Sequence, residues 1–244
     1  MLTLTACGGD KKADAKEADN NPASATPSPA KPFEGLTPAQ ISEKSRLAMT
    51  KLKSFKVKGS MTSHGEEMTF DFTVVAKGDC RGNFTHAGAS AELRMVGGHT
   101  YMKGDKKFWQ QTGRKEGSSP EEINAITEMF KGRWFKVPAK AAKADDRFPF
   151  CDTAMMFKRD KKDGRLTRGA ETEVNGSRAV TLMGKEGAQT QTLFVSAQGE
   201  PYVLRMTAVG GKEPGSLEFS AFNEPVTVTP PSASEVIDLD KLKR

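Results

Sequence analysis

Residues 54–75 read SFKVKGSMTSHGEEMTFDFTVV and alternate between apolar and polar side chains. Two alternating runs flank a turn at Ser63-His64-Gly65. Their apolar positions are Phe55, Val57, Gly59 and Met61 before the turn, and Met68, Phe70, Phe72 and Val74 after it. A period of two residues on each side of a turn predicts two antiparallel strands, each with one apolar and one polar face.

Further alternating runs extend this pattern in two groups. The first group is 80–86, 92–96 and 99–103, and the second is 171–174, 178–183, 190–195, 202–208 and 216–222. Gly97-Gly98 and Asn175-Gly176 separate neighbouring runs, and such dipeptides are typical of tight hairpin turns. The sequence therefore predicts two antiparallel meanders, with a short strand at 134–138 and a short closing segment at 234–239.

Two helices are predicted from their first turns. Thr37 with Gln40 and Ser119 with Glu122 each form a capping box, and a proline follows each capping residue. Leu36 and Ile41 provide the hydrophobic staple of the first helix. Its expected inward stripe is Ile41, Ser45, Ala48 and Leu52, and that of the second is Ile123, Ile126, Met129 and Phe130. A third, short helix is expected over 149–157, which carries Cys151.

The N-terminal sequence Leu4-Thr5-Ala6-Cys7-Gly8-Gly9 resembles the lipobox of bacterial lipoproteins. The resemblance implies that Cys7 is lipidated and that residues 1–6 are the remnant of a signal peptide, because a signal needs a longer apolar stretch. Residues 7–32 contain no apolar residue larger than alanine or proline, so we expect a flexible tether. The expected location is extracytoplasmic, on the outer face of the cell membrane.

Composition limits the classes of function. The chain has 244 residues and a formal net charge of +6, and its mean hydropathy is −0.56. Its lysines and arginines are spread along the chain from Lys11 to Arg244 rather than clustered, so we expect no nucleic-acid partner. Cys80 and Cys151 form an even pair, for which a disulfide is expected in an oxidising compartment, and two buried free thiols are the alternative. Closing a loop of about 72 residues would contribute roughly 4 kcal/mol.

Five short phrases resemble the LppX/LprG family of actinobacterial lipoproteins, which share the LolA/LolB-like fold. The phrases are Leu36-Thr37-Pro38-Ala39, Ser54-Phe55-Lys56-Val57-Lys58-Gly59, Val96-Gly97-Gly98-His99-Thr100-Tyr101, Trp134-Phe135-Lys136-Val137-Pro138 and Pro230-Pro231. The resemblance implies an α+β fold over residues 33–244, a single domain in which a curved antiparallel half-barrel sheet packs over a few helices. It also implies a hydrophobic cavity that binds an acylated lipid or glycolipid and carries it in the cell envelope. The Cys80–Cys151 pair is not part of the family pattern, which suggests a separate branch.

The apolar faces of the predicted strands are rich in methionine and phenylalanine, whose large side chains suit a surface that accepts acyl chains. The expected cavity-lining residues are Val57, Met61, Met68, Phe70, Phe72, Val74, Leu93, Met95, Met102, Leu204, Met206 and Phe219. The alternative is that these side chains fill an ordinary core. The chain would then be an envelope protein-interaction or sensor module without lipid cargo.

Catalytic signatures are absent from the sequence. His64, His86 and His99 are isolated, and no nucleophile elbow, phosphate loop or metal-binding spacing occurs. We therefore expect no catalytic residue, no metal site and no cofactor. The expected state is a monomer, for which an envelope transporter is a candidate partner.

Overall fold

The computed structural model describes residues 31–76, 78–138, 149–158, 166–238 and 241. The predicted signal remnant, Cys7 and nearly all of the predicted tether lie outside the described residues. One compact unit of the chain runs from Pro32 to Arg244.

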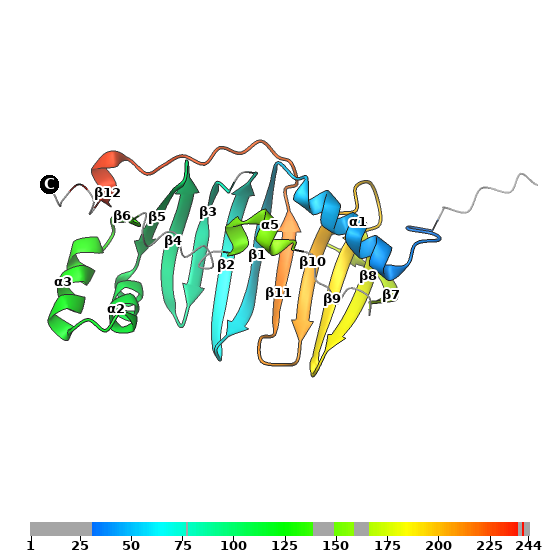
Figure 1. The fold of residues 1–244 in the computed structure, drawn as a ribbon, viewed down its shortest axis with the longest axis horizontal. Coiled ribbons are helices and arrows are strands. Elements are labelled where there is room, and N and C mark those ends of the chain that lie inside the picture. The colour runs from blue at the N-terminus through cyan, green and yellow to red at the C-terminus, as the bar shows by residue number, and fades with distance from the viewer. Residues whose placement is uncertain (1–30, 77, 139–148, 159–165, 239–240, 242–244) are drawn as a thin grey trace, which may run out of the picture. The chain divides into compact units, whose positions relative to one another are not determined.

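Twelve strands among the described residues form one curved sheet (Figure 1). They are β1 (Ser54–Ser63), β2 (Glu66–Val75), β3 (Cys80–His86), β4 (Ala89–Val96), β5 (His99–Gly104), β6 (Trp134–Lys136), β7 (Thr167–Val174), β8 (Ser177–Glu186), β9 (Gln189–Ser196), β10 (Val203–Val209), β11 (Gly215–Ser220) and β12 (Val236–Asp238). The order across the sheet is β12-β6-β5-β4-β3-β2-β1-β11-β10-β9-β8-β7, and every pair except β12–β6 is antiparallel. The predicted fold class is confirmed.

The two predicted meanders join at the middle of the sheet. Val57 of β1 lies opposite Phe72 of β2 on one side and opposite Phe219 of β11 on the other. The first strand of the chain therefore lies in the middle of the sheet, with a hydrogen-bonded neighbour on each side. This long-range pairing connects both halves into one continuous sheet.

Two helical elements lie on one face of the sheet, and two others lie at its β5–β6 end (Figure 1). The first two are α1 (Pro38–Thr50) and α5 (Thr153–Met156), which follows the short 3-10 turn η2 (Pro149–Cys151). The others are α2 (Lys106–Lys115) and α3 (Pro120–Phe130), and a further 3-10 turn, η4 (Ala233–Glu235), precedes β12. None of the described helices has the length and apolar character needed to cross a bilayer.

Both predicted capping boxes are present, at Thr37 before α1 and at Ser119 before α3. The inward face of α1 differs from the predicted stripe, because Met49 is fully buried whereas Ala48 is only half-buried. Leu52 is buried as predicted, although it lies beyond the last helical turn.

Helix α2 was not predicted from the sequence. Asp105 caps it by accepting a hydrogen bond from the backbone N–H of Phe108 at 2.7 Å. Trp109 is buried in this helix, and its ring lies 4.9 Å from the ring of Phe130 in α3. The α2–α3 pair therefore forms a small aromatic cluster of its own, with Phe135 of β6 beside it.

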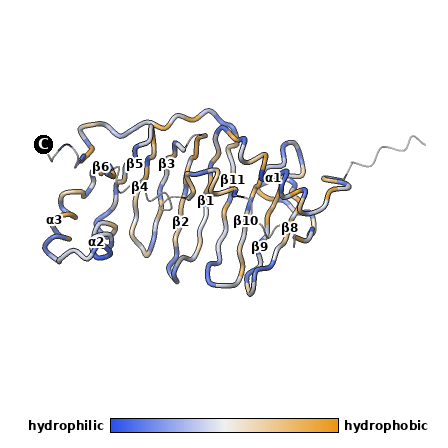
Figure 2. Tube along the Cα trace, viewed as in Figure 1, coloured by the Kyte–Doolittle hydropathy of each residue, from blue (hydrophilic) through white to orange (hydrophobic). Residues whose placement is uncertain are grey.

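We call the sheet face that packs against α1 and α5 the inner face, and the opposite one the outer face. Apolar and polar positions alternate along the strands, as Figure 2 shows by colour. Val57, Phe72 and Leu93 lie in one cross-strand row of the inner face and are buried in the largest apolar cluster. The outer face carries mainly polar and charged side chains, among them Lys56, Arg81 and Glu218.

Candidate functional site

The inner face contains a cavity of about 340 Å³ between strands β8–β11 and the helical elements α1 and α5. Most of its lining side chains are apolar, and the charged ones are few. It is lined by Ser42, Arg46, Met61, Met156, Phe157, Lys158, Leu166, Leu182, Gln191, Thr192, Leu193, Val203, Met206, Thr207, Ala208, Glu213, Gly215, Ser216 and Leu217.

A row of four apolar side chains forms the sheet wall of this cavity. Leu193 lies opposite Leu182 and Met206, and Met206 lies opposite Leu217, so the row crosses β8, β9, β10 and β11. Two residues beyond Met206 in β10, Ala208 lies opposite Gly215 of β11. Ala208 adds little side-chain volume to the cavity, whereas at Gly215 strand β1 lies close, since a Cβ there would be 2.8 Å from the Cβ of Met61.

The other wall comes from α1 and α5. Arg46 of α1 is held by Glu43, whose carboxylate oxygens accept hydrogen bonds from Nε and Nη2 at 2.8 Å each. Met156 and Phe157 cover the cavity from the α5 side, and Lys158 follows them at its border. The cavity thus lies between a mainly apolar sheet and a helical wall that carries Lys158 and the Arg46–Glu43 ion pair.

A segment of the described chain, Pro149–Lys158, fills the rest of the inner face, and we call it the covering segment. The predicted disulfide between Cys80 of β3 and Cys151 attaches it to the sheet. The ring of Phe150 stacks on that of Phe70 at a centroid distance of 4.1 Å. Phe157 contacts the ring of Phe55, with centroids 6.1 Å apart.

The covering segment determines where the sequence-predicted residues lie. Met61 and Met206 line the cavity. The others fall in or against the packed core under the covering segment: Val57, Phe70, Phe72, Val74, Leu93 and Phe219 are buried, and Met68, Met95 and Met102 pack against them. The inner face is therefore filled over β1–β4 and hollow over β8–β11.

Leu204 does not share a face with Met206, although alternation places the two together. It packs with Val174 and Ala179 in a separate cluster. The cause is an irregularity in the β9–β10 pairing, where the register shifts between Val203 and Arg205. A bulge of this kind reverses the direction of the side chains that follow it.

Most of the lining residues were missed in the sequence, among them three leucines of the sheet wall, Leu182, Leu193 and Leu217. Each lies in a predicted strand, so the alternation could have found them.

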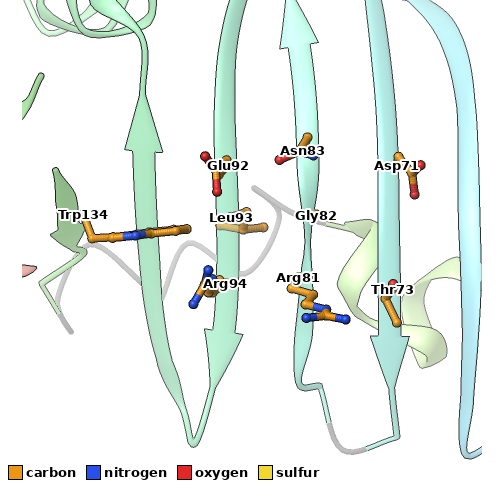
Figure 3. A pocket seen from close by; sticks show the side chains of 9 residues that line it. All are labelled: Asp71, Thr73, Arg81, Gly82, Asn83, Glu92, Leu93, Arg94 and Trp134. Carbon is orange, nitrogen blue, oxygen red and sulfur yellow. The ribbon is translucent and has the colours of Figure 1, made fainter. Parts of the chain in front are cut away.

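A second pocket, of about 250 Å³, lies on the outer face (Figure 3). Charged and polar side chains of β2, β3 and β4 surround it, including Asp71, Arg81 and Glu92. The guanidinium of Arg94 lies over the ring of Trp134 at 4.6 Å from its centroid. This polar pocket does not suit an acyl chain.

A third and larger groove, of about 630 Å³, lies beside β6 and β12. Four of its eleven lining residues are charged, namely Arg133, Lys136, Asp238 and Lys241. In the inner-face cavity only three of nineteen are charged. The inner-face cavity is therefore the better candidate for an apolar ligand.

Comparisons with known proteins agree with this architecture. No protein-family model matches the chain, and no curated protein sequence matches it. Among solved structures, lipoprotein LppX of Mycobacterium tuberculosis is similar with a TM-score of 0.50 and 15% identity, over 78% of this chain and 97% of that chain. LprF of Mycobacterium bovis is similar with a TM-score of 0.51 and 14% identity, over 80% of this chain and 97% of that one. The predicted resemblance is thus confirmed at the level of structure, and the chain has the fold of LppX and LprF.

Proposed function

We propose that this protein is an envelope lipoprotein that binds an acylated lipid in the inner-face cavity and carries it within the cell envelope. The cavity itself carries the proposal, because about 340 Å³ lies within the range of about 300–1,000 Å³ that is usual for ligand sites. Binding of this kind needs no chemical reaction. It needs only apolar protein surface that replaces the lipid environment of the acyl chain.

The free energy available from such a cavity is sufficient for binding. Burial of one methylene group contributes about 0.8 kcal/mol, so ten methylenes contribute roughly 8 kcal/mol before the costs of ordering. The row formed by Leu193, Met206 and Leu217 offers an apolar track along which a chain could lie. Met61 and Met206 can adapt their shape to it.

The proposed location rests on the lipobox and on the disulfide. A lipid on Cys7 would hold the protein at the membrane surface, and the tether would let the folded unit reach away from it. The Cys80–Cys151 disulfide fits an oxidising compartment outside the cytoplasm. The fold that the chain shares with lipoprotein LppX also supports this assignment.

The proposal can be tested by native mass spectrometry of the full chain with Cys7→Ser, purified from bacteria. We expect co-purified lipid, or saturable uptake of a fluorescent fatty acid. Ala208→Phe should fill the cavity and lower uptake about tenfold or more, because the added ring occupies the ligand volume. Ser220→Phe, on the exposed outer side of β11, is the matched control and should bind as the parent does.

An empty parent protein that takes up no fatty acid would refute the proposal. That result would favour the protein-interaction module instead. Equal uptake by the parent and the Ala208→Phe variant would show that the lipid binds elsewhere.

A further inference from the structure

The two walls of the inner-face cavity differ in polarity. The sheet wall is apolar at Leu193, Met206 and Leu217, whereas α1 presents Ser42 and Arg46. Ser42 is 8% exposed, so its hydroxyl lies within the protein rather than in solvent. A wholly apolar ligand would offer no hydrogen bond to the Ser42 hydroxyl, whereas Arg46 keeps its bonds to Glu43.

A neighbouring serine shows the same feature. Ser45 lies three residues after Ser42 on the same face of α1 and is 0% exposed. Its hydroxyl has no hydrogen-bond partner among the described residues. Buried hydroxyls are nearly always paired, because an unpaired one loses its bonds to water and gains none in return. Of the two serines only Ser42 lines the cavity, so it is the Ser42 hydroxyl that favours a ligand with a hydrogen-bond acceptor at this wall.

The charges of the lining are separated in space. Arg46 and Lys158 lie on the helical side, and α1 contacts α5 directly. The acidic lining residue, Glu213, lies in the connection between β10 and β11, which Figure 1 shows at the end of the strands away from α1. Lys158 has no ion pair within the described residues. The net positive charge of the lining, that of Lys158 beside the Arg46–Glu43 ion pair, thus lies at the helical end of the cavity.

We propose that the cavity selects an anionic single-chain amphiphile. Its carboxylate or phosphate head group is bound by Lys158 and Arg46, and the Ser42 hydroxyl donates a hydrogen bond to it. Its acyl chain lies against Leu193 and Met206 and runs toward the β10–β11 end. A volume of about 340 Å³ suits one chain rather than several. This assignment rests on the proposed lipid-binding function and adds the charge of the head group and the number of chains.

The test compares three ligands that have the same chain length and different head groups: dodecanoate, dodecyl phosphate and dodecanol. Each ligand is used to displace a fluorescent fatty acid from the full-length protein with Cys7→Ser. We expect both anions to bind about tenfold more tightly than dodecanol, since hydrogen bonds to charged groups are the stronger ones. The anion that binds more tightly identifies the head group, a carboxylate as in a free fatty acid or a phosphate as in a phospholipid.

Lys158→Gln should weaken the binding of the anions about fivefold to tenfold and leave that of dodecanol unchanged. Lys44→Gln, on the exposed side of α1, is the matched control and should change neither. Both lysines are exposed, so neither variant should affect folding.

The outcomes separate the two proposals. Equal affinity for the anions and dodecanol would overturn the head-group assignment and leave lipid binding intact. An equal loss of both ligand classes in Lys158→Gln would also overturn it, because a lost charge contact weakens only the anions. Failure of all three ligands to bind would overturn lipid binding itself.

Discussion

Removal of the Cys80–Cys151 disulfide should strongly destabilise the folded unit. The bond joins residues that are 71 positions apart, and both sulfur atoms are buried. In the chain-entropy model, closing a loop of this size stabilises the folded state by about 4 kcal/mol relative to the reduced chain. The appropriate substitution is alanine at both positions, because a serine hydroxyl would be buried in the apolar cluster without a partner.

Urea denaturation, followed by circular dichroism, measures the effect in the full chain with Cys7→Ser. The double alanine variant should lose about 4 kcal/mol of unfolding free energy, which corresponds to roughly 8–16 °C in melting temperature for a unit of this size. A reductant should shift the parent by a similar amount and leave the variant unchanged, which serves as the internal control. A loss below about 1 kcal/mol would refute the loop-entropy argument. It would show that ring contacts such as Phe150 on Phe70 suffice to fix the covering segment.

Two further predictions concern single side chains. Met49→Ala should lower the free energy of unfolding by about 3 kcal/mol, because Met49 is 0% exposed and its Sδ accepts a hydrogen bond from the backbone N–H of Val203 at 3.3 Å. Leu47→Ala, at an exposed position of the same helix, is the control and should change it by less than about 0.5 kcal/mol. Urea denaturation measures both variants. The hydrogen bonds that Arg205 donates hold the pKa of Glu218 below its usual range, so this carboxylate stabilises the protein above the pKa it has in the unfolded chain. That contribution is lost as the pH falls through the folded pKa. In Glu218→Gln the urea midpoint should therefore fall less steeply than in the parent as the pH is lowered from 5. An equally steep fall in both proteins would argue against a stabilising role of the Glu218 carboxylate.

Much of the fold could be predicted because its signals are local. Alternation between apolar and polar residues located the strands of both meanders, and the capping boxes at Thr37 and Ser119 located the starts of α1 and α3. Helix α2 was not predicted because its short sequence is mostly polar and its capping residue, Asp105, lies directly after a strand. The hairpin partner of β1 was predicted, but its second neighbour, β11, could not be deduced, since the pairing of Val57 with Phe219 has no local signature.

The sequence predicted an apolar cavity against one face of the sheet, but not which strands form it. The same alternating pattern describes a strand that faces a cavity and a strand that faces a covering segment. Phe70 and Phe72 lie against Phe150, whereas Leu193 faces open volume, and no property of the single strands separates the two cases. The location of the cavity depends on which part of the inner face the covering segment, Pro149–Lys158, occupies.

The position of β1 has a consequence for how the chain is made. A strand that pairs with both β2 and β11 stays open on one side until almost the entire polypeptide has emerged. During synthesis its unpaired amides and carbonyls can pair with a strand from another molecule, and lysines along such an edge, here Lys56 and Lys58, oppose this. Loss of residues 215–244 would remove β11 from the middle of the sheet together with β12 from its edge.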